Sequence, residues 1–268
     1  MSQILYEDEA IIVVRKSAGI AVQTARLGQQ DVVSELKNYL CRGGGGGRGE
    51  PYLGVIHRLD QPVEGILVFA KTKACAAFLT AQLQKQGDES AFCKGYYAVL
   101  CGIPDKREGR LSDYLYKQTV KNGKYTDYRA VVIGRLPENG DCTESLNRRG
   151  DRAHRAGKNV TCAEKARRAV LEYRILETLE EQGLSLADIR IHTGRFHQIR
   201  AQMAYGGMPL LGDMKYGSPE TEELARRFGV QNVALCACRL GFVHPVSGEK
   251  MDFRIKPENP AFSSFSQL

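Results

Sequence analysis

Segments with strand-like patterns follow one another closely along this chain, and this spacing restricts the folds that it can adopt. Two such segments come first, at 4–7 and 10–16, with only Asp8 and Glu9 between them. Strand signals recur through the hairpin-rich stretch 109–134 and again after it. Parallel strands need long crossover connections, whereas antiparallel strands can follow one another through short turns. The pattern therefore predicts a largely antiparallel sheet.

Helical patterns are fewer and lie between the strand-like segments. Residues 31–40 have apolar side chains at helical spacing, and residues 72–86 repeat that pattern after Thr72, a residue typical of N-caps. A third helical pattern, inside 193–207, puts Phe196, Ile199 and Met203 on one face. This mixture predicts an α+β fold, in which helices flank a mixed, largely antiparallel central sheet.

Two segments do not fit the pattern of regular elements. Residues 137–168 contain few large apolar side chains, and their basic residues outnumber the acidic ones. We interpret this segment as a basic surface insertion, which as a solvated loop needs no ligand and which is also a candidate contact for an RNA backbone. The five glycines at 43–47 predict a flexible loop and match no phosphate-binding motif.

Composition limits the class of protein and of partner. The 268 residues carry 38 Lys and Arg against 31 Asp and Glu, a formal net charge of +7. A basic excess suits a polyanionic partner such as nucleic acid, and it is equally compatible with a basic enzyme that binds none. The N-terminus lacks a basic-then-apolar signal, and no apolar run is long enough to span a membrane. We expect a soluble, cytoplasmic protein with no membrane contact.

The eight cysteines do not indicate a metal site or a disulfide framework. No two of them have CxxC spacing, and several lie inside apolar runs, where cysteine behaves as a small hydrophobic residue. Reduced thiols and the absence of a zinc site are the expectation.

The segment HRLDQPVEGILVFAK, residues 57–71, places Arg58 and Asp60 directly before an apolar run. In an extended backbone the two side chains point to the same side. A guanidinium beside a carboxylate favours its ionised form, and an ionised carboxylate can act as nucleophile, base or metal ligand. A structural ion pair is the more common explanation of such a pair when it stands alone.

A second polar cluster lies in TGRFHQIR, residues 193–200. Within six residues it contains four polar side chains: Arg195, His197, Gln198 and Arg200. A helix with a polar face explains them as well as a binding site does, and the spacing differs from that of a two-histidine zinc helix. The stretch MPLLGDMKYG, residues 208–217, is explained by turn chemistry alone.

Taken together, these segments resemble the RluA-type RNA pseudouridine synthases. HRLDQPVEGILVFAK is similar to that family's HRLDxxTSGLLLFAK, and HTGRFHQIRAQMAYGGMPLLGDMKYG to its TGRTHQIRVHLAxxGxPIxGDxxYG. The family's opening, tyrosine-bearing strand and closing strand pair have counterparts in ILYEDEAIIVVRKSAGIAV, KGYYAVLCG and FVHPVSGEKMDF. The matches follow the family order from residue 4 to about residue 254.

The resemblance implies a single catalytic domain over 1–268, with a catalytic cleft, that isomerises uridine in structured RNA to pseudouridine. Asp60 then takes the role of the family's nucleophile. Tyr96 corresponds to a tyrosine that stacks on the uracil and is placed to help proton removal at C5, and Arg200 to the basic residue that pairs with the nucleophile. The reaction implied needs no cofactor and no metal. The resemblance leaves open whether the aspartate assists loss of the base or attacks the ring.

The resemblance also implies how RNA is held. The target base must be flipped out of its stack, and Arg58 corresponds to a residue thought to fill the vacated position. His57, Arg195, His197 and Gln198 are expected to order the site or touch RNA, with His197 as a general base the less supported alternative. The expected substrate is ribosomal or transfer RNA, and the protein is expected to be a monomer with no obligatory protein partner. The chain begins at the catalytic segment without an S4 domain, which favours a transfer RNA or a dual substrate.

Two departures from the family pattern affect the expected site. Val63-Glu64 replaces the usual Thr-Ser after HRLD, which removes hydroxyls and adds a carboxylate near the nucleophile. A second carboxylate there would disfavour the charged form of the nucleophile unless Glu64 faces away. At the opening, Arg15-Lys16-Ser17 replaces Asn-Lys-Pro.

Two other functions remain open from the residues. An RNA-binding protein without catalysis would keep the basic surface and lose the site residues. A glycosidase-type hydrolase would need two carboxylates that flank the scissile bond, and Asp60 with Glu64 resembles such a pair.

Overall fold

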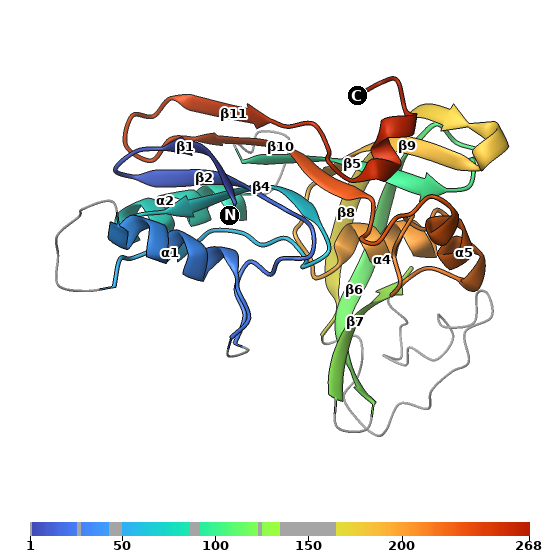
Figure 1. The fold of residues 1–268 in the computed structure, drawn as a ribbon, viewed down its shortest axis with the longest axis horizontal. Coiled ribbons are helices and arrows are strands. Elements are labelled where there is room, and N and C mark those ends of the chain that lie inside the picture. The colour runs from blue at the N-terminus through green and yellow to red at the C-terminus, as the bar shows by residue number, and fades with distance from the viewer. Residues whose placement is uncertain (1, 26–27, 43–49, 86–91, 123–124, 135–164) are drawn as a thin grey trace.

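The computed structural model describes residues 2–25, 28–42, 50–85, 92–122, 125–134 and 165–268. Figure 1 shows its strands and helices. The strands are β1 Gln3–Glu7, β2 Ile11–Lys16, β3 Gly54–Val55, β4 Glu64–Ala70, β5 Cys93–Cys101, β6 Glu108–Asn122, β7 Tyr125–Ile133, β8 Arg167–Leu179, β9 Leu184–Ile191, β10 Leu235–Val243 and β11 Lys250–Arg254. The helices are α1 Val32–Arg42, α2 Lys73–Gln84, α4 Gln198–Tyr205 and α5 Pro219–Arg227, and the 3-10 turns are η2 Glu180–Gln182 and η3 Pro260–Ser264.

The described strands form one sheet of mixed, largely antiparallel pairing. Its order is β1-β2-β4-β10-β5-β9-β8-β6-β7, and β11 pairs with β10 while β3 pairs with β4. The neighbours β4 and β10 run parallel, and the other described pairs run antiparallel. The predicted α+β fold with a mixed, largely antiparallel sheet is therefore confirmed.

The long hairpin of β6 and β7 extends away from the rest of the sheet (Figure 1). It confirms the hairpin predicted for this part of the chain. The segment that follows, 135–164, lies outside the described residues, and with it most of the basic insertion predicted at 137–168. The glycine run at 43–47 lies outside them as well.

The two faces of the sheet carry different helices because successive residues of a strand point to opposite sides. On β2, Ile12 and Val14 pack with the buried residues of α1, and Ile11 and Val13 pack with those of α2. The α1 face continues to α4, whose Ile199 joins the same core. Helix α5 packs elsewhere, in a core on the side opposite Tyr96 of β5.

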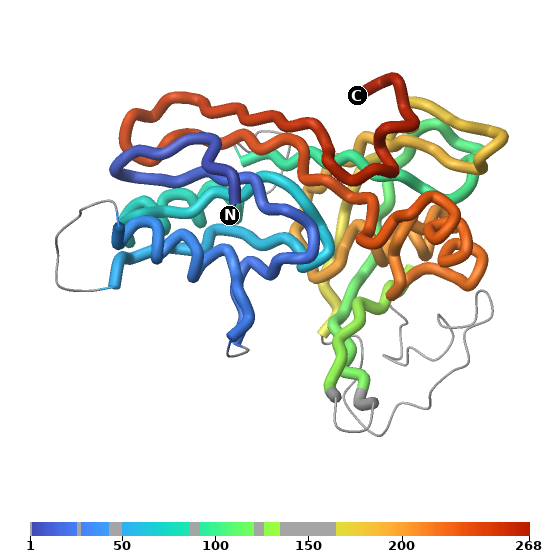
Figure 2. The backbone as a smooth tube through the Cα atoms, viewed as in Figure 1, coloured from blue at the N-terminus to red at the C-terminus, as the bar shows by residue number. Residues whose placement is uncertain are grey.

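The chain after β11 returns to the body of the protein (Figure 2). In η3 and just after it, Phe262 and Phe265 are buried against Val99 of β5 and Leu186 of β9. This final segment is therefore part of the core packing rather than a free end. No helix in the described part of the chain is long and apolar enough to cross a membrane.

Helix α4 begins later than its apolar pattern suggested. His197 precedes its first residue with a left-handed backbone, φ 52°, so the helical phase does not extend back to Phe196. Ile199 and Met203 are buried as expected, but Phe196 is 38% exposed. The prediction that Phe196 shares their buried face is wrong, because the reversal at His197 turns the preceding residue outward.

Candidate active site

Asp60 lies in a turn that leads directly into β4. The backbone N–H of Val63 donates to the carbonyl of Asp60 at 3.0 Å, which closes the turn. Leu59 and Val63 are buried on either side of the turn, whereas the Asp60 side chain is 26% exposed. The apolar neighbours anchor the turn, and the carboxylate remains accessible from outside.

Arg200 of α4 connects two carboxylates. Its Nη1 donates to Asp60 Oδ2 at 3.1 Å, while its Nε and Nη2 donate to the two oxygens of Asp213 at 2.7 Å each. Burial alone lowers the pKa of Arg200, but hydrogen bonding and charge from Asp213, and then from Asp60, outweigh burial and raise it. Arg200 is therefore held by a two-point contact with Asp213, and its Nη1 faces Asp60.

Asp213 is a site residue that the sequence reasoning missed, because turn chemistry seemed to explain its segment. Its side chain is 1% exposed, and Oδ1 also accepts the N–H groups of Lys215 and Tyr216 at 3.0 and 3.2 Å. The turn depends on a glycine at 212 for two reasons. Gly212 has a left-handed backbone, with φ of +78°, and a Cβ there would lie 2.7 Å from the carbonyl oxygen of Asn232. The GDxxYG part of the family segment contains Asp213 and is the signal in the sequence that could have identified it.

Lys16 supports the same turn from β2. The side chain is fully buried, and its Nζ donates to the carbonyls of Ser17, Ile20 and Gln61 at 3.0, 2.7 and 3.1 Å. Burial lowers the pKa of Lys16 to about 8, although the charges of Asp60 and Glu64 oppose that shift. By holding Gln61, the residue after Asp60, Lys16 ties the turn to the sheet.

His197 lies between Asp60 and Tyr216. Its Nε2 is 3.6 Å from Asp60 Oδ2, and its Nδ1 is 2.8 Å from the Tyr216 hydroxyl. Burial lowers the pKa of His197 to about 4, which the charge of Asp60 only partly offsets. His197 is therefore neutral near neutral pH and supplies a hydrogen-bonding ring rather than a cation.

Tyr96 of β5 is buried in the core on the α1 and α4 face. Burial, followed by the charge of Asp60, raises the pKa of Tyr96. Its phenol therefore stays protonated at neutral pH, and its ring belongs to the same core cluster as Leu59 and Val63, which lie on either side of Asp60 in the chain.

Two of the remaining expected site residues, His57 and Gln198, are buried, and among the described residues no hydrogen bond joins either of them to Asp60. His57 is buried, with its ring in a T-shaped arrangement with Phe92 and its pKa lowered to about 3 by burial and then by Lys94. Gln198 is buried too, and it accepts hydrogen bonds from Thr193 Oγ1 and the Arg195 N–H.

Arg195 and Arg58 lie nearer the surface. Arg195 is partly exposed, and its Nε donates to the carbonyl of Arg168 at 3.0 Å. Arg58 is exposed, and among the described residues no ion pair joins it to Asp60, although the two are close in sequence. These placements favour an ordering role for His57 and Gln198 and leave Arg58 and Arg195 accessible to a ligand.

Glu64 does not face Asp60. Its side chain is buried at 3% exposure and its oxygens accept backbone N–H groups of Glu258 and Asn259. From the sequence, we expect Glu64 to disfavour the charged form of the Asp60 carboxylate unless its side chain faces away. The side chain does face away, toward Glu258 and Asn259. Within the described residues, no group of three or more His, Cys, Asp or Glu side chains is arranged to hold a metal ion.

The arrangement presents one accessible carboxylate, oriented by a buried guanidinium and beside a neutral imidazole. A carboxylate so held can attack an electrophilic carbon or stabilise a developing positive charge. Asp213, the second carboxylate that Arg200 contacts, accepts two of its hydrogen bonds, so it is not free to act as a paired acid or base.

Comparison with known proteins gives a consistent result. The family model for RNA pseudouridylate synthases matches residues 10–205. The "Ribosomal large subunit pseudouridine synthase D" of Zymomonas mobilis is 31% identical over 256 residues, which cover 94% of this chain and 68% of that protein. An "Uncharacterized RNA pseudouridine synthase" of Aquifex aeolicus is 30% identical, over 99% of this chain and 72% of that protein.

Solved structures share the fold. The structure titled "Human RNA Pseudouridylate Synthase Domain Containing 4" aligns with a TM-score of 0.65 at 20% sequence identity. The alignment covers 96% of this chain and 89% of that one. At this level of sequence identity the likeness shows a shared fold.

Proposed function

Because the chain belongs to the RluA-type RNA pseudouridine synthases, we propose that it isomerises a flipped-out uridine of structured RNA with Asp60 as the nucleophile. One observation carries this assignment: Asp60 is an accessible carboxylate held by Arg200, which Asp213 in turn fixes from the buried side. The chain is thus an isomerase that acts on RNA. What we propose beyond this is the role of each residue in the site.

The reaction rearranges bonds within one nucleotide. The C1′–N1 bond of the uridine breaks, the uracil rotates, and a C1′–C5 bond forms, while the proton at C5 is lost and N1 gains one. No atom is added and nothing is oxidised. Asp60 takes part by assisting loss of the base from the ribose or by attack on the ring, and both routes start from the same accessible carboxylate.

The target base has to leave its stack to reach Asp60, at a cost of a few kcal/mol. We assign Arg58 to the position that the base vacates, because it is exposed and only two residues from Asp60. Its flat guanidinium can stack and contact phosphate at the same time. We also propose that a cleft beside Asp60 receives the flipped base.

Tyr96 is assigned to stacking on the uracil. Its raised pKa keeps the phenol protonated, so a phenolate is not available as a ready base for the C5 proton. Its aromatic ring, in the same core cluster as Leu59 and Val63 on either side of Asp60, instead offers a flat surface on which a base can rest. Removal of the C5 proton then follows bond formation, when that proton becomes acidic.

The proposed substrate is ribosomal RNA, with transfer RNA as the alternative. The similar protein from Zymomonas mobilis carries the name of a synthase for the large ribosomal subunit, which supports ribosomal RNA as the first substrate to test. The net charge of +7 suits either polyanion. A monomer that acts in the cytoplasm without an obligatory protein partner completes the proposal.

One assay tests the proposed reaction. RNA labelled with tritium at C5 of uridine is incubated with the protein, and released tritium, free uracil and RNA integrity are measured. We expect tritium release with intact RNA and no free uracil. Free uracil would instead indicate a hydrolase, and neither product would indicate an RNA-binding protein without catalysis. The position of Glu64 already counts against a hydrolase that pairs it with Asp60.

Two exposed rings beside the site suggest where the RNA next to the target uridine lies. Phe196 and Tyr128 are 38% and 41% exposed, and Lys117 Nζ lies 4.9 and 3.8 Å from their ring centres. Phe196 also stacks on His197 with ring centres 3.7 Å apart, and His197 is next to Asp60. Exposed aromatic rings with a lysine are typical of surfaces that bind unpaired nucleotides.

Phe196→Thr, which restores the residue of the family segment, should therefore weaken RNA binding. Loss of one stacked base is worth about 1–3 kcal/mol, so the dissociation constant should rise roughly tenfold. Filter binding and single-turnover kinetics measure it, and the rate at saturating RNA should change much less than the affinity.

The matched control is Phe78→Thr, the same change at a phenylalanine 44% exposed on α2, which packs on the opposite face of the sheet. Equal losses of affinity in both variants, or wild-type affinity in Phe196→Thr, would remove Phe196 from the RNA path.

A further inference from the structure

Two of the departures from the family pattern, Arg15 and Glu64, meet in space. Arg15 stands where the family segment has Asn, and Glu64 where it has Ser. Arg15 Nη2 lies 3.5 Å from Glu64 Oε2, although the residues are in different strands, β2 and β4. Both side chains are largely buried, at 13% and 3% exposure. A buried charge is tolerated when it is paired, so each departure compensates the other.

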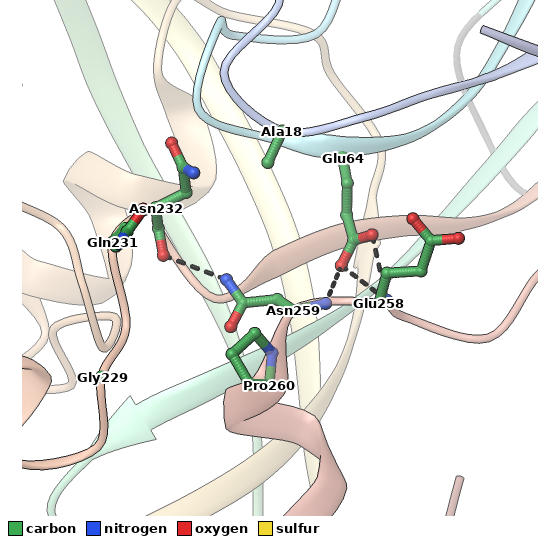
Figure 3. Close-up of a pocket in the computed structure, with 8 residues that line it drawn as sticks. All are labelled: Ala18, Glu64, Gly229, Gln231, Asn232, Glu258, Asn259 and Pro260. Atoms are coloured by element: carbon green, nitrogen blue, oxygen red, sulfur yellow. Dashed lines mark hydrogen bonds between the residues drawn. The ribbon is translucent and has the colours of Figure 1, made fainter. Parts of the chain in front are cut away.

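The same pair holds the segment that follows β11. Glu64 accepts the N–H of Glu258 at 3.1 and 3.0 Å and that of Asn259 at 3.0 Å (Figure 3). Arg15 donates to the carbonyl of Lys256 at 2.8 Å and pairs with the Glu258 carboxylate at 3.0 Å. We call the contacts of Arg15, Glu64 and residues 256–259 the tail clamp.

The tail clamp contacts the C-terminal end of the turn that begins at Asp60, which we call the catalytic turn. Glu64 is the first residue of β4, and the turn that begins at Asp60 closes one residue before it. Lys16, next to Arg15 on β2, holds the carbonyl of Gln61 at the near end. The following residue, Gly65, packs so closely on β10 that a Cβ there would overlap the Cβ of Ala237.

We propose that the tail clamp is a positioning device for Asp60: Arg15 and Glu64 use the backbone of residues 256–259 as a fixed support for the catalytic turn. The inference rests on the proposed role of Asp60 as the reacting carboxylate. Glu64 touches neither substrate nor Asp60 and acts through the turn. A small displacement of a reacting group can cost a large factor in rate while binding is unchanged.

Glu64→Ser tests the proposal, since it restores the family residue and removes the acceptor of the tail. The pocket of about 380 Å³ beside Glu64, Glu258 and Asn259 gives water access to the exposed N–H groups, so the variant is expected to fold. We expect the single-turnover rate to fall about tenfold or more, with RNA affinity within roughly twofold. Amide exchange measured by mass spectrometry should become faster in a peptide that covers 60–66.

Glu177→Ala is the control for general loosening of the tail. Glu177 of β8 accepts the N–H groups of Ser266 and Gln267 at 2.8 and 3.1 Å and has no part in the catalytic turn. It should speed exchange near the C-terminus and leave both the rate and the exchange of 60–66 as in the wild type.

The outcomes separate the clamp from the proposed function. Unchanged exchange of 60–66 in Glu64→Ser overturns the clamp, and so does a Glu177→Ala rate that falls as far as that of Glu64→Ser. A wild-type protein that releases no tritium overturns the proposed function. In that case, the comparison of amide exchange at 60–66 between Glu64→Ser and the wild type still tests the clamp.

Discussion

Asp60→Asn should abolish pseudouridine formation while RNA binding and folding persist. The substitution keeps the size and one oxygen of the side chain, so Arg200 still has an acceptor, but it removes the charge and nucleophilicity on which both routes of the reaction depend. Loss of an essential nucleophile typically costs on the order of 10³-fold or more in rate. Tritium release under single-turnover conditions measures the loss, and filter binding should give an RNA affinity within about twofold of the wild type.

The fold should tolerate this change. The Asp60 side chain is 26% exposed, and Arg200 keeps both of its hydrogen bonds to Asp213. Asp252→Asn is the matched control, because it makes the same chemical change at a carboxylate paired with Arg239 at 3.0 Å on another edge of the sheet. Turnover above about one per cent in both Asp60→Asn and Asp60→Ala would exclude Asp60 as the nucleophile.

Local patterns in the sequence were sufficient to predict the fold class. Strand and helix signals depend on neighbours within a few residues, and the hairpins, α1, α2 and the antiparallel character of the sheet all followed from them. The phase of α4 was harder, because a single left-handed residue, His197, separates Phe196 from the helix. A hydrophobic spacing pattern does not report such a backbone reversal.

The candidate site was predictable only in part, because its support comes from residues far apart in the chain. Arg200 reaches Asp60 across 140 positions, a contact that the resemblance implied. Asp213, which holds Arg200 from the other side, lies in a turn whose local chemistry gave no reason to look further. The same holds for Glu64, since its acceptor role is defined by Glu258 and Asn259, 194 and 195 positions later.

Arg200→Met should lower both stability and turnover, for two separable reasons. The substitution leaves Asp213 as a buried carboxylate without its cation, with only the Lys215 and Tyr216 N–H groups as donors. Breaking a buried ion pair in this way costs about 3–5 kcal/mol, which corresponds to a fall in Tm of roughly 10 °C for a chain of this size. Turnover should fall about 100-fold even well below that Tm, because Asp60 loses the group that orients it.

The double variant Arg200→Met with Asp213→Asn distinguishes the two reasons. Removing both charges of a buried pair is often nearly neutral for stability, and the Asn oxygen can still accept the N–H groups of Lys215 and Tyr216. Calorimetry should therefore show that most of the lost Tm returns. Single-turnover tritium release should stay low, because Asp60 still lacks its donor. Recovery of turnover together with stability would mean that Arg200 serves only the fold, and the role assigned to it beside Asp60 would have to be withdrawn.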